Sequence, residues 1–362
     1  MRIIDRYIFK QVTSGYVLLL VAFLFLYVII DASSQLQDIL KDKIPFLIIL
    51  KYYLFFLPQI FIVVSPFSFL LSSLYCIGVL NKDNEIISLR TQGMSVLGIA
   101  QVFIVLAIFL SFVSLFLEDQ IIPQSYGQLK QIRGYKELKL KEDEIVEKFA
   151  FYSSEGYVVF ARDFNLSQRT LNNVNVFVQD EKGNITHEII AEKLVYRAGS
   201  WNFINASFYM LVENRLMPGS PSFMEERELD LSDTPRELFE KSNMRWQDLS
   251  LKDIQNQISK LAAWKARKII NSLRVEFHRK IALSFSTFFM LLGSLPFALK
   301  IKKRQVGLSS LGLAFFTGFL YYVMFSLSSP LGKVDFFFPW LSCWLPNVFF
   351  GISGAVGLYT LT

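Results

Sequence analysis

Long stretches without charged residues lie at both ends of the chain and are rich in Leu, Ile, Val and Phe. About 20 apolar residues in a helix cross the hydrocarbon core of a bilayer. The pattern therefore predicts an α-helical polytopic membrane protein with six transmembrane helices, three on each side of a polar central region. The predicted spans cover residues 11–30, 52–81, 91–117, 281–299, 305–332 and 336–362.

The central region changes to short runs of β-branched and aromatic residues. Residues 156–162, 174–179 and 207–212 have the composition of strands, and several of them alternate apolar and polar positions. Turn-forming residues at 181–184 separate two of these runs. Short strands with turn signals are typical of sandwiches and jelly rolls, so we expect residues 118–249 to form an inserted all-β domain.

After the β region, the pattern becomes that of a mixed-charge helix. Ser250 and Asp253 have the spacing of a capping box. The stretch 250–280 is therefore expected to be an amphipathic helical connector into the fourth span. The chain then divides into a first membrane part at 1–117, the β domain, this connector, and a second membrane part at 281–362.

A second short helix is predicted between spans two and three, at about 82–94. Asp83 or Asn84 is the expected N-cap, and Gly93 is expected to end the helix. Glu85 suits the N-terminal end of the helix dipole, while Ile86, Leu89 and Arg90 project from one side. Such a helix gives a motor protein leverage on a membrane domain; the alternative is a helix that lies on the lipid surface.

Composition supports the membrane assignment. The 362 residues are 52% hydrophobic and only 19% charged, whereas a soluble domain has about 25% charged residues. Residues 118–280 contain 24 basic and 24 acidic residues, so the net charge of +6 lies in the segments that flank the spans. A soluble enzyme is excluded, and the positive charge does not indicate nucleic acid binding, because it marks cytoplasmic loops.

The short loops set the orientation. With the N-terminus in the cytoplasm, nine basic residues fall inside and four outside, which agrees with the positive-inside rule. We therefore expect both termini in the cytoplasm and the β domain on the other side of the membrane. The inside residues are Arg2, Arg6, Lys10, Lys82, Arg90, Lys300, Lys302, Lys303 and Arg304; the outside residues are Lys41, Lys43, Lys51 and Lys333.

No motif for catalysis is present in the sequence. A phosphate-binding P-loop, a zinc-protease H-E-x-x-H motif and a G-x-S-x-G nucleophile elbow are all missing. Cys76 and Cys343 lie inside apolar runs, and the histidines are His187 and His278. We therefore expect no catalytic residue, no metal site and no cofactor, and any ATP must be bound by a partner subunit.

Several short motifs resemble the LptF/LptG family of lipopolysaccharide export permeases. Residues 84–95 are similar to the coupling-helix segment of that family, and residues 2–8 to its N-terminus. Residues 275–282 and 295–298 resemble its fourth span, and 344–347 its last span. The motifs cover nearly the whole chain in the order of the family, on the same three-plus-three arrangement.

The resemblance implies one permease subunit of an ABC transporter in the bacterial inner membrane, which extracts lipopolysaccharide. The implied partners are a paralogous permease (LptF or LptG), a cytoplasmic LptB-like ABC ATPase dimer and a single-span LptC-like bridge protein. The central domain is then a periplasmic β-jelly roll that passes the lipid towards the outer membrane. Residues 5–8 and the chain end directly after span six favour the LptG type.

The resemblance also assigns candidate site residues. Glu85 is the expected contact with the ATPase, together with Ile86, Leu89 and Arg90. Lipopolysaccharide is anionic, so basic side chains near the outer leaflet are expected to bind its phosphates. These are Lys41, Lys43, Lys130, Arg133, Lys136 and Lys333. Asp31 stands where family members often carry a basic residue, so the contribution of the first span stays open.

Two other functions fit parts of the pattern. A membrane-anchored sensor or scaffold would use the β domain to bind a periplasmic ligand, but the longest predicted inside loop has only about ten residues and leaves no output domain. An ABC permease for another lipid, such as a lipoprotein exporter, would have one span before its domain and three after it. The three-plus-three arrangement argues against that alternative.

Overall fold

The computed structural model divides the chain into two compact units. We call Met1–Leu129, Leu249–Gln255 and Asn271–Thr362 the membrane unit, and Lys130–Asp248 with Asn256–Ile270 the sheet unit. The structure describes residues 3–41, 45–129, 145–152, 157–165, 168–179, 185–197, 199–212, 215–216, 222–229, 234–235, 238, 249–263, 267–300, 306–334 and 336–360.

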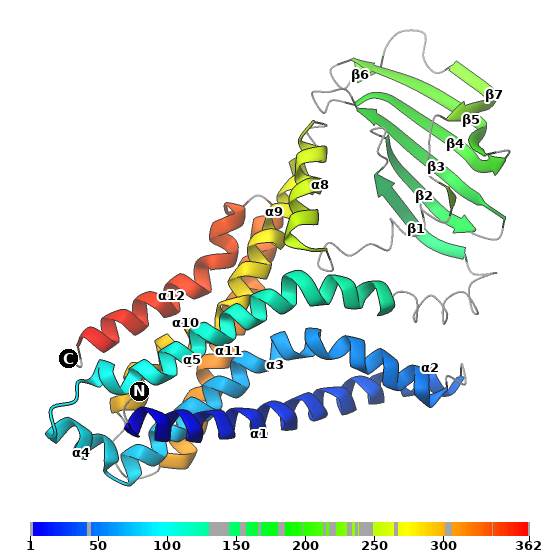
Figure 1. Ribbon diagram of the computed structural model, residues 1–362. Helices are drawn as coiled ribbons and strands as arrows, with labels where there is room; N and C mark the ends of the chain where they lie inside the picture. Colours follow the sequence, from blue (N-terminus) through cyan, green and yellow to red (C-terminus); the bar gives the residue numbers. More distant parts are fainter. Residues whose placement is uncertain are drawn as a thin grey trace. The chain divides into compact units, whose positions relative to one another are not determined.

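The membrane unit is built from long apolar helices (Figure 1). Its first part contains α1 (Ile3–Ser34), α2 (Leu36–Lys41), α3 (Phe46–Lys82), α4 (Glu85–Thr91), α5 (Val96–Phe116) and the π-helical turn η1 (Leu117–Ile121). Its second part contains α10 (Ser286–Lys300), α11 (Val306–Lys333) and α12 (Pro339–Tyr359). Two helices, α8 (Leu251–Ala263) and α9 (Arg267–Ser284), belong partly to each unit.

Within the described residues, five helices are long and apolar enough to cross a membrane, and there are up to six spans if a bent pair counts as one. The bent pair is Ile270–Ser284 with Ser286–Lys300, which meet at 51°. The span predicted at 281–299 lies across this bend, so its helix begins earlier than the sequence suggested. The charged residues of α9 hid this start from a search for charge-free stretches.

Helix packing in the membrane unit centres on α3 and α10. The helix α3 lies beside α1, α10 and α11, while α10 also lies beside α5 and α12. Two glycines allow the close approach of α10 and α12. A Cβ at Gly354 would overlap the backbone of Leu292, and one at Gly293 would lie 2.5 Å from the ring of Phe350.

The sheet unit contains an antiparallel sheet, which confirms the expected β region in the middle of the chain. Figure 1 shows β1 to β5 side by side. The strands are β1 (Ile145–Tyr152), β2 (Tyr157–Asn165), β3 (Thr170–Gln179), β4 (Ile185–Arg197), β5 (Ser200–Val212), β6 (Arg215–Leu216) and β7 (Ser222–Leu229). From β1 to β6 each strand pairs with its neighbour in the chain, and β7 returns to the free edge of β5. These described strands therefore follow the order of a meander.

Two asparagines interrupt the alternation along the strands. Asn173 and Asn205 have φ values of 48° and 54°, in the left-handed region that asparagine tolerates better than most residues. Buried positions therefore follow a spacing of three at these points, as for Leu171 and Val174. The shift keeps the apolar side chains on one face of the sheet, where they form a single buried cluster.

Candidate functional site

The short helix predicted at about 82–94 is α4. Gly93 follows its C-terminal end with φ of 87°, and its N–H donates to the carbonyl of Arg90, as expected for a glycine that ends a helix. The predicted N-cap is corrected. Asn84 precedes the helix with φ of 61°, but its side chain makes no capping hydrogen bond.

The side chains of α4 face two ways. Ile86 and Leu89 share a buried side of the helix: they are 5% and 8% exposed and belong to the core of the membrane unit. Their apolar side chains turn inward because α4 packs against α3. Arg90 is exposed, and Glu85 is partly exposed. The buried pair therefore anchors α4, and the two charged residues remain accessible to solvent.

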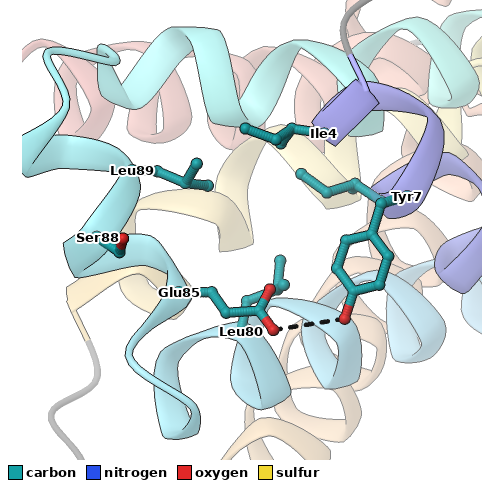
Figure 2. A pocket seen from close by; sticks show the side chains of 7 residues that line it. Ile4, Tyr7, Leu80, Glu85, Ser88 and Leu89 are labelled. Carbon is teal, nitrogen blue, oxygen red and sulfur yellow. Dashed lines mark hydrogen bonds between the residues drawn. The ribbon is translucent and has the colours of Figure 1, made fainter.

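A pocket joins α4 to the start of α1 (Figure 2). The Tyr7 hydroxyl donates to Glu85 Oε1 across 3.4 Å, which is at the long end for a hydrogen bond. The pocket is lined by Ile4, Tyr7, Ile8, Leu80, Glu85, Ser88 and Leu89. The carboxylate of Glu85 thus lies at the edge of a small depression formed by α1, α3 and α4.

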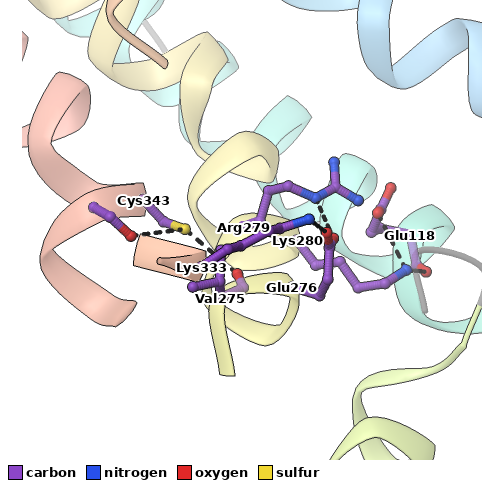
Figure 3. Close-up of polar contacts among 8 residues, drawn as sticks. Glu118, Val275, Glu276, Arg279, Lys280, Lys333 and Cys343 are labelled. Carbon is purple, nitrogen blue, oxygen red and sulfur yellow. Dashed lines mark hydrogen bonds and ion pairs between the residues drawn. The ribbon is translucent and has the colours of Figure 1, made fainter. Parts of the chain in front are cut away.

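A cluster of charged side chains lies among α9, α11 and η1 (Figure 3). The Glu276 carboxylate accepts from Arg279 Nε at 2.5 Å through Oε2 and from Lys333 Nζ at 2.7 Å through Oε1. Glu276 is 1% exposed. One carboxylate on α9 is therefore shared by a cation of its own helix and a cation of α11.

A second ion pair connects α9 to η1. Lys280 is fully buried, and its Nζ lies 3.2 Å from Glu118 Oε1 and 3.5 Å from the Glu118 carbonyl oxygen. Helical segments of the π type are rare and occur frequently at functional sites. The next residue, Asp119, accepts from the backbone N–H of Leu251 at 2.8 Å and so caps the start of α8.

Of the capping box predicted before α8, the structure shows the bond to the Ser250 side chain. Ser250 Oγ accepts from the Asp253 N–H at 3.1 Å and lies 2.6 Å from the Asp253 carboxylate. This local hydrogen bonding, together with Asp119, fixes the point at which α8 begins. Residues far apart in the chain thus meet at η1, which lies within the candidate span Val96–Leu129.

The predicted phosphate-binding residues have different positions. Lys41 is exposed at the end of α2. Lys333 is paired with Glu276, a residue that the sequence interpretation did not include. The other predicted residues, Lys43, Lys130, Arg133 and Lys136, lie outside the described residues.

Asp31, which stands where family members often carry a basic residue, forms two side-chain hydrogen bonds. Its Oδ2 accepts from the Tyr53 hydroxyl and from Gln35 Nε2, both at 2.9 Å. The carboxylate thus joins α1 to α3.

The sequence contains one signal for the charged cluster around Glu276 and Lys280, namely charged residues directly before a predicted span. Residues 275–282 include Glu276, Arg279 and Lys280 directly before the predicted fourth span. Ionisable residues at membrane depth are costly and often functional. Their partners, Glu118 and Lys333, are 162 and 57 positions away from Lys280 and Glu276, so pairing could not be read from local spacing.

Comparison with known proteins supplies the family. The family model described as lipopolysaccharide export system permease LptF/LptG matches residues 6–360. The chain belongs to the LptF/LptG family. None of the curated proteins compared matches it.

The match extends through α1 to α12 and the strands between them, so it includes both units. Membership confirms the resemblance seen in the coupling-helix segment and in the span motifs. The chain is thus a multi-pass membrane protein and a permease of a lipopolysaccharide export system. The family is one of transporter permeases rather than of enzymes.

Proposed function

We propose that this chain is one of two permease subunits of an ABC exporter that extracts lipopolysaccharide from the bacterial inner membrane. A paralogous permease, a cytoplasmic LptB-like ATPase dimer and an LptC-like bridge protein complete the complex. The family match over residues 6–360 carries the proposal. The missing P-loop supports an ATPase supplied by a partner, so ATP is bound outside this chain.

The geometry of α4 supports its role as the coupling helix. A lever must be firmly held by the body that it moves and must offer charged groups to the motor. Ile86 and Leu89 supply the first property because they are buried in the core. Glu85 and Arg90 supply the second because they are at least partly exposed. We assign Glu85 to the principal contact with the ATPase.

The distribution of basic residues supports the direction of transport. Nine basic residues against four in the short loops place the termini and α4 in the cytoplasm, on the side of the ATPase. The sheet unit is then periplasmic and passes the lipid towards the outer membrane. Of the two paralogues, the LptG type is the one proposed.

Lipid capture by basic side chains is the second part of the proposal. Lys41, Lys43, Lys130, Arg133, Lys136 and Lys333 supply charge for the phosphates of the lipid. Charge reversal at both Arg133 and Lys333 should weaken lipid crosslinking to the complex. Unchanged crosslinking would contradict this part and leave the coupling role of α4 intact.

The coupling role is tested with Glu85→Lys in the complex that co-purifies with the tagged chain. ATP hydrolysis and lipid release are both measured in proteoliposomes. We expect hydrolysis to continue while lipid release falls at least tenfold, because the charge contact to the ATPase is reversed. Asp83→Lys is the matched control: it makes the same change of charge at an exposed residue just before α4 and should release lipid normally.

Two results would contradict the proposal. Normal lipid release by the Glu85→Lys complex would remove Glu85 from the mechanism. Purification of the chain without an ABC ATPase and a second six-span protein would contradict the proposal that the chain is a subunit of an ABC exporter. In that case the sensor or scaffold function would become the better hypothesis.

A further inference from the structure

Glu276 occupies an unusual environment for a carboxylate. It lies in a helix that forms part of a candidate span, and its side chain is 2% exposed. A buried ion pair gives little net stability compared with apolar residues of the same size, because both charges lose their hydration. Ionisable residues at this depth are therefore expected to have a function beyond stability.

The helix that carries Glu276 is the first half of the bent helix pair, a candidate span. It ends at Ser284, and the next helix leaves from Ser286 at an angle of 51°. Towards α11 the contact is ionic, through Glu276 and Lys333; towards η1 it is also ionic, through Lys280 and Glu118. Ionic contacts can exchange partners, so an incoming charge is able to replace the contacts that these two ion pairs make, while apolar packing and hydrogen bonds to α12 remain.

Glu276 differs from an ordinary ion pair because two cations share it. If Lys333 leaves, Arg279 still neutralises the carboxylate from one turn along the same helix. The large penalty of an unpaired buried charge is then avoided. Lys333 also has the more accessible side chain, 39% exposed against 19% for Arg279, so an anion can approach it from outside.

We propose that Glu276 is an ionic latch that holds α9 to α11, and that a phosphate of the bound lipid opens it by taking Lys333. This inference rests on the proposed function, since it uses the lipid as the source of the phosphate. Opening lets α9 turn about its break at Phe285. Glu276 is a positioning residue: it acts through Lys333 and need not contact the lipid.

A native cysteine reports on this movement. Cys343 of α12 is fully buried, and its thiol donates to the Val275 carbonyl of α9 at 3.4 Å (Figure 3). Val275 precedes Glu276, well before the break, so a turn of α9 uncovers the thiol. Cys76 in α3 is also buried and serves as an internal control for general loosening of the fold.

The experiment measures the rate of N-ethylmaleimide addition to each cysteine by peptide mass spectrometry, in the intact complex in nanodiscs. We expect Glu276→Gln and Lys333→Gln each to raise the Cys343 rate at least fivefold, with Cys76 unchanged. The double variant should be no faster than the faster single variant, because both changes break one contact. Lys51→Gln removes an exposed lysine of α3 and should change neither rate.

Three results would overturn the latch. These are unchanged Cys343 rates in both single variants, equal acceleration of Cys76, and additive effects in the double variant. Unchanged Cys343 rates would mean that α9 stays in place without the contact between Glu276 and Lys333. Equal acceleration of Cys76 would indicate loosening of the whole fold. Additive effects would mean that Glu276 and Lys333 act through different contacts.

The lipid arm tests the opening step. Added lipopolysaccharide should raise the Cys343 rate of the unmodified complex at least threefold and leave that of Glu276→Gln nearly unchanged. Dephosphorylated lipopolysaccharide and inorganic phosphate should have no effect. Acceleration by inorganic phosphate alone would refute the claim that the phosphate must belong to a lipid. Acceleration by the dephosphorylated lipid would refute the claim that a phosphate opens the contact.

Failure of the proposed function is distinguishable from failure of the latch. If the complex releases no lipopolysaccharide but the single variants still uncover Cys343, the latch is retained and the lipid assignment is lost. If the complex transports lipid and lipopolysaccharide leaves the Cys343 rate unchanged, the opening step is overturned.

Discussion

The buried pair of Lys280 and Glu118 leads to a quantitative prediction for the stability of the membrane unit. The two charges lie 3.2 Å apart, and Lys280 is fully buried. At an effective dielectric constant of about 20, Coulomb's law gives an attraction of about 5 kcal/mol at this distance. Most of this attraction offsets the lost hydration of the two groups, so the pair as a whole contributes little to the free energy of unfolding.

Breaking the pair on one side should therefore cost much more than removing it. Glu118→Gln leaves a buried ammonium without its carboxylate, and we expect a loss of about 3–5 kcal/mol. Lys280→Met should cost about 3 kcal/mol, because the Glu118 side chain keeps 10% exposure to solvent. The double variant, which carries neither charge, should lie within about 2 kcal/mol of the original chain. The interaction energy in this cycle is then about 4 kcal/mol or more.

The assay is reversible unfolding of the purified chain in mixed detergent micelles, followed by tryptophan fluorescence. Lys300→Met makes the same substitution at an exposed lysine at the end of α10 and should be almost neutral. An interaction energy below about 0.5 kcal/mol would mean that the two residues act independently. The assignment of a tightly coupled pair would then be refuted.

Two further predictions concern packing and polar contacts between spans. Gly354→Ala should lower the free energy of unfolding by about 1–3 kcal/mol, because the added methyl group meets the backbone of Leu292. Gly312→Ala is the control, because a methyl group there enters open space. Equal losses in the two variants would contradict the packing argument. Asn347→Leu should cost about 1–3 kcal/mol, because the Asn347 Oδ1 accepts from the buried Tyr321 hydroxyl at 2.7 Å. Thermal unfolding measures both losses, and adding Tyr321→Phe to Asn347→Leu should recover part of the second.

The positions of the membrane helices could largely be predicted from the local pattern of apolar residues. Charge-free stretches predicted five of the spans close to their observed positions, because a membrane helix satisfies its backbone within itself and needs only an apolar surface. The fourth span was placed too late in the chain. Its first half carries Glu276 and Lys280, and these buried charges are tolerated because Arg279 and Lys333 neutralise the first and Glu118 neutralises the second.

The coupling helix shows the same division on a smaller scale. Its position followed from Glu85 at one end and Gly93 at the other, which are local signals. The direction of its side chains did not. Ile86 and Leu89 turn towards the core because α4 folds back onto α3, and this contact is absent from the spacing of residues within the helix.

The amino-acid sequence was enough to predict the membrane class, a central β region, Ser250 as the N-cap of α8 and the family. Each of these predictions depends on residues close together in the chain or on the order of motifs along it, which can be read without a structure. Tertiary structure alone decided the 51° bend, the sharing of Glu276 between Arg279 and Lys333, and the burial of Lys280 against η1. The physical reason is that hydrophobicity acts at each position separately, whereas a buried charge is stable only beside its partner, and that partner is chosen by the packing of helices distant in the chain.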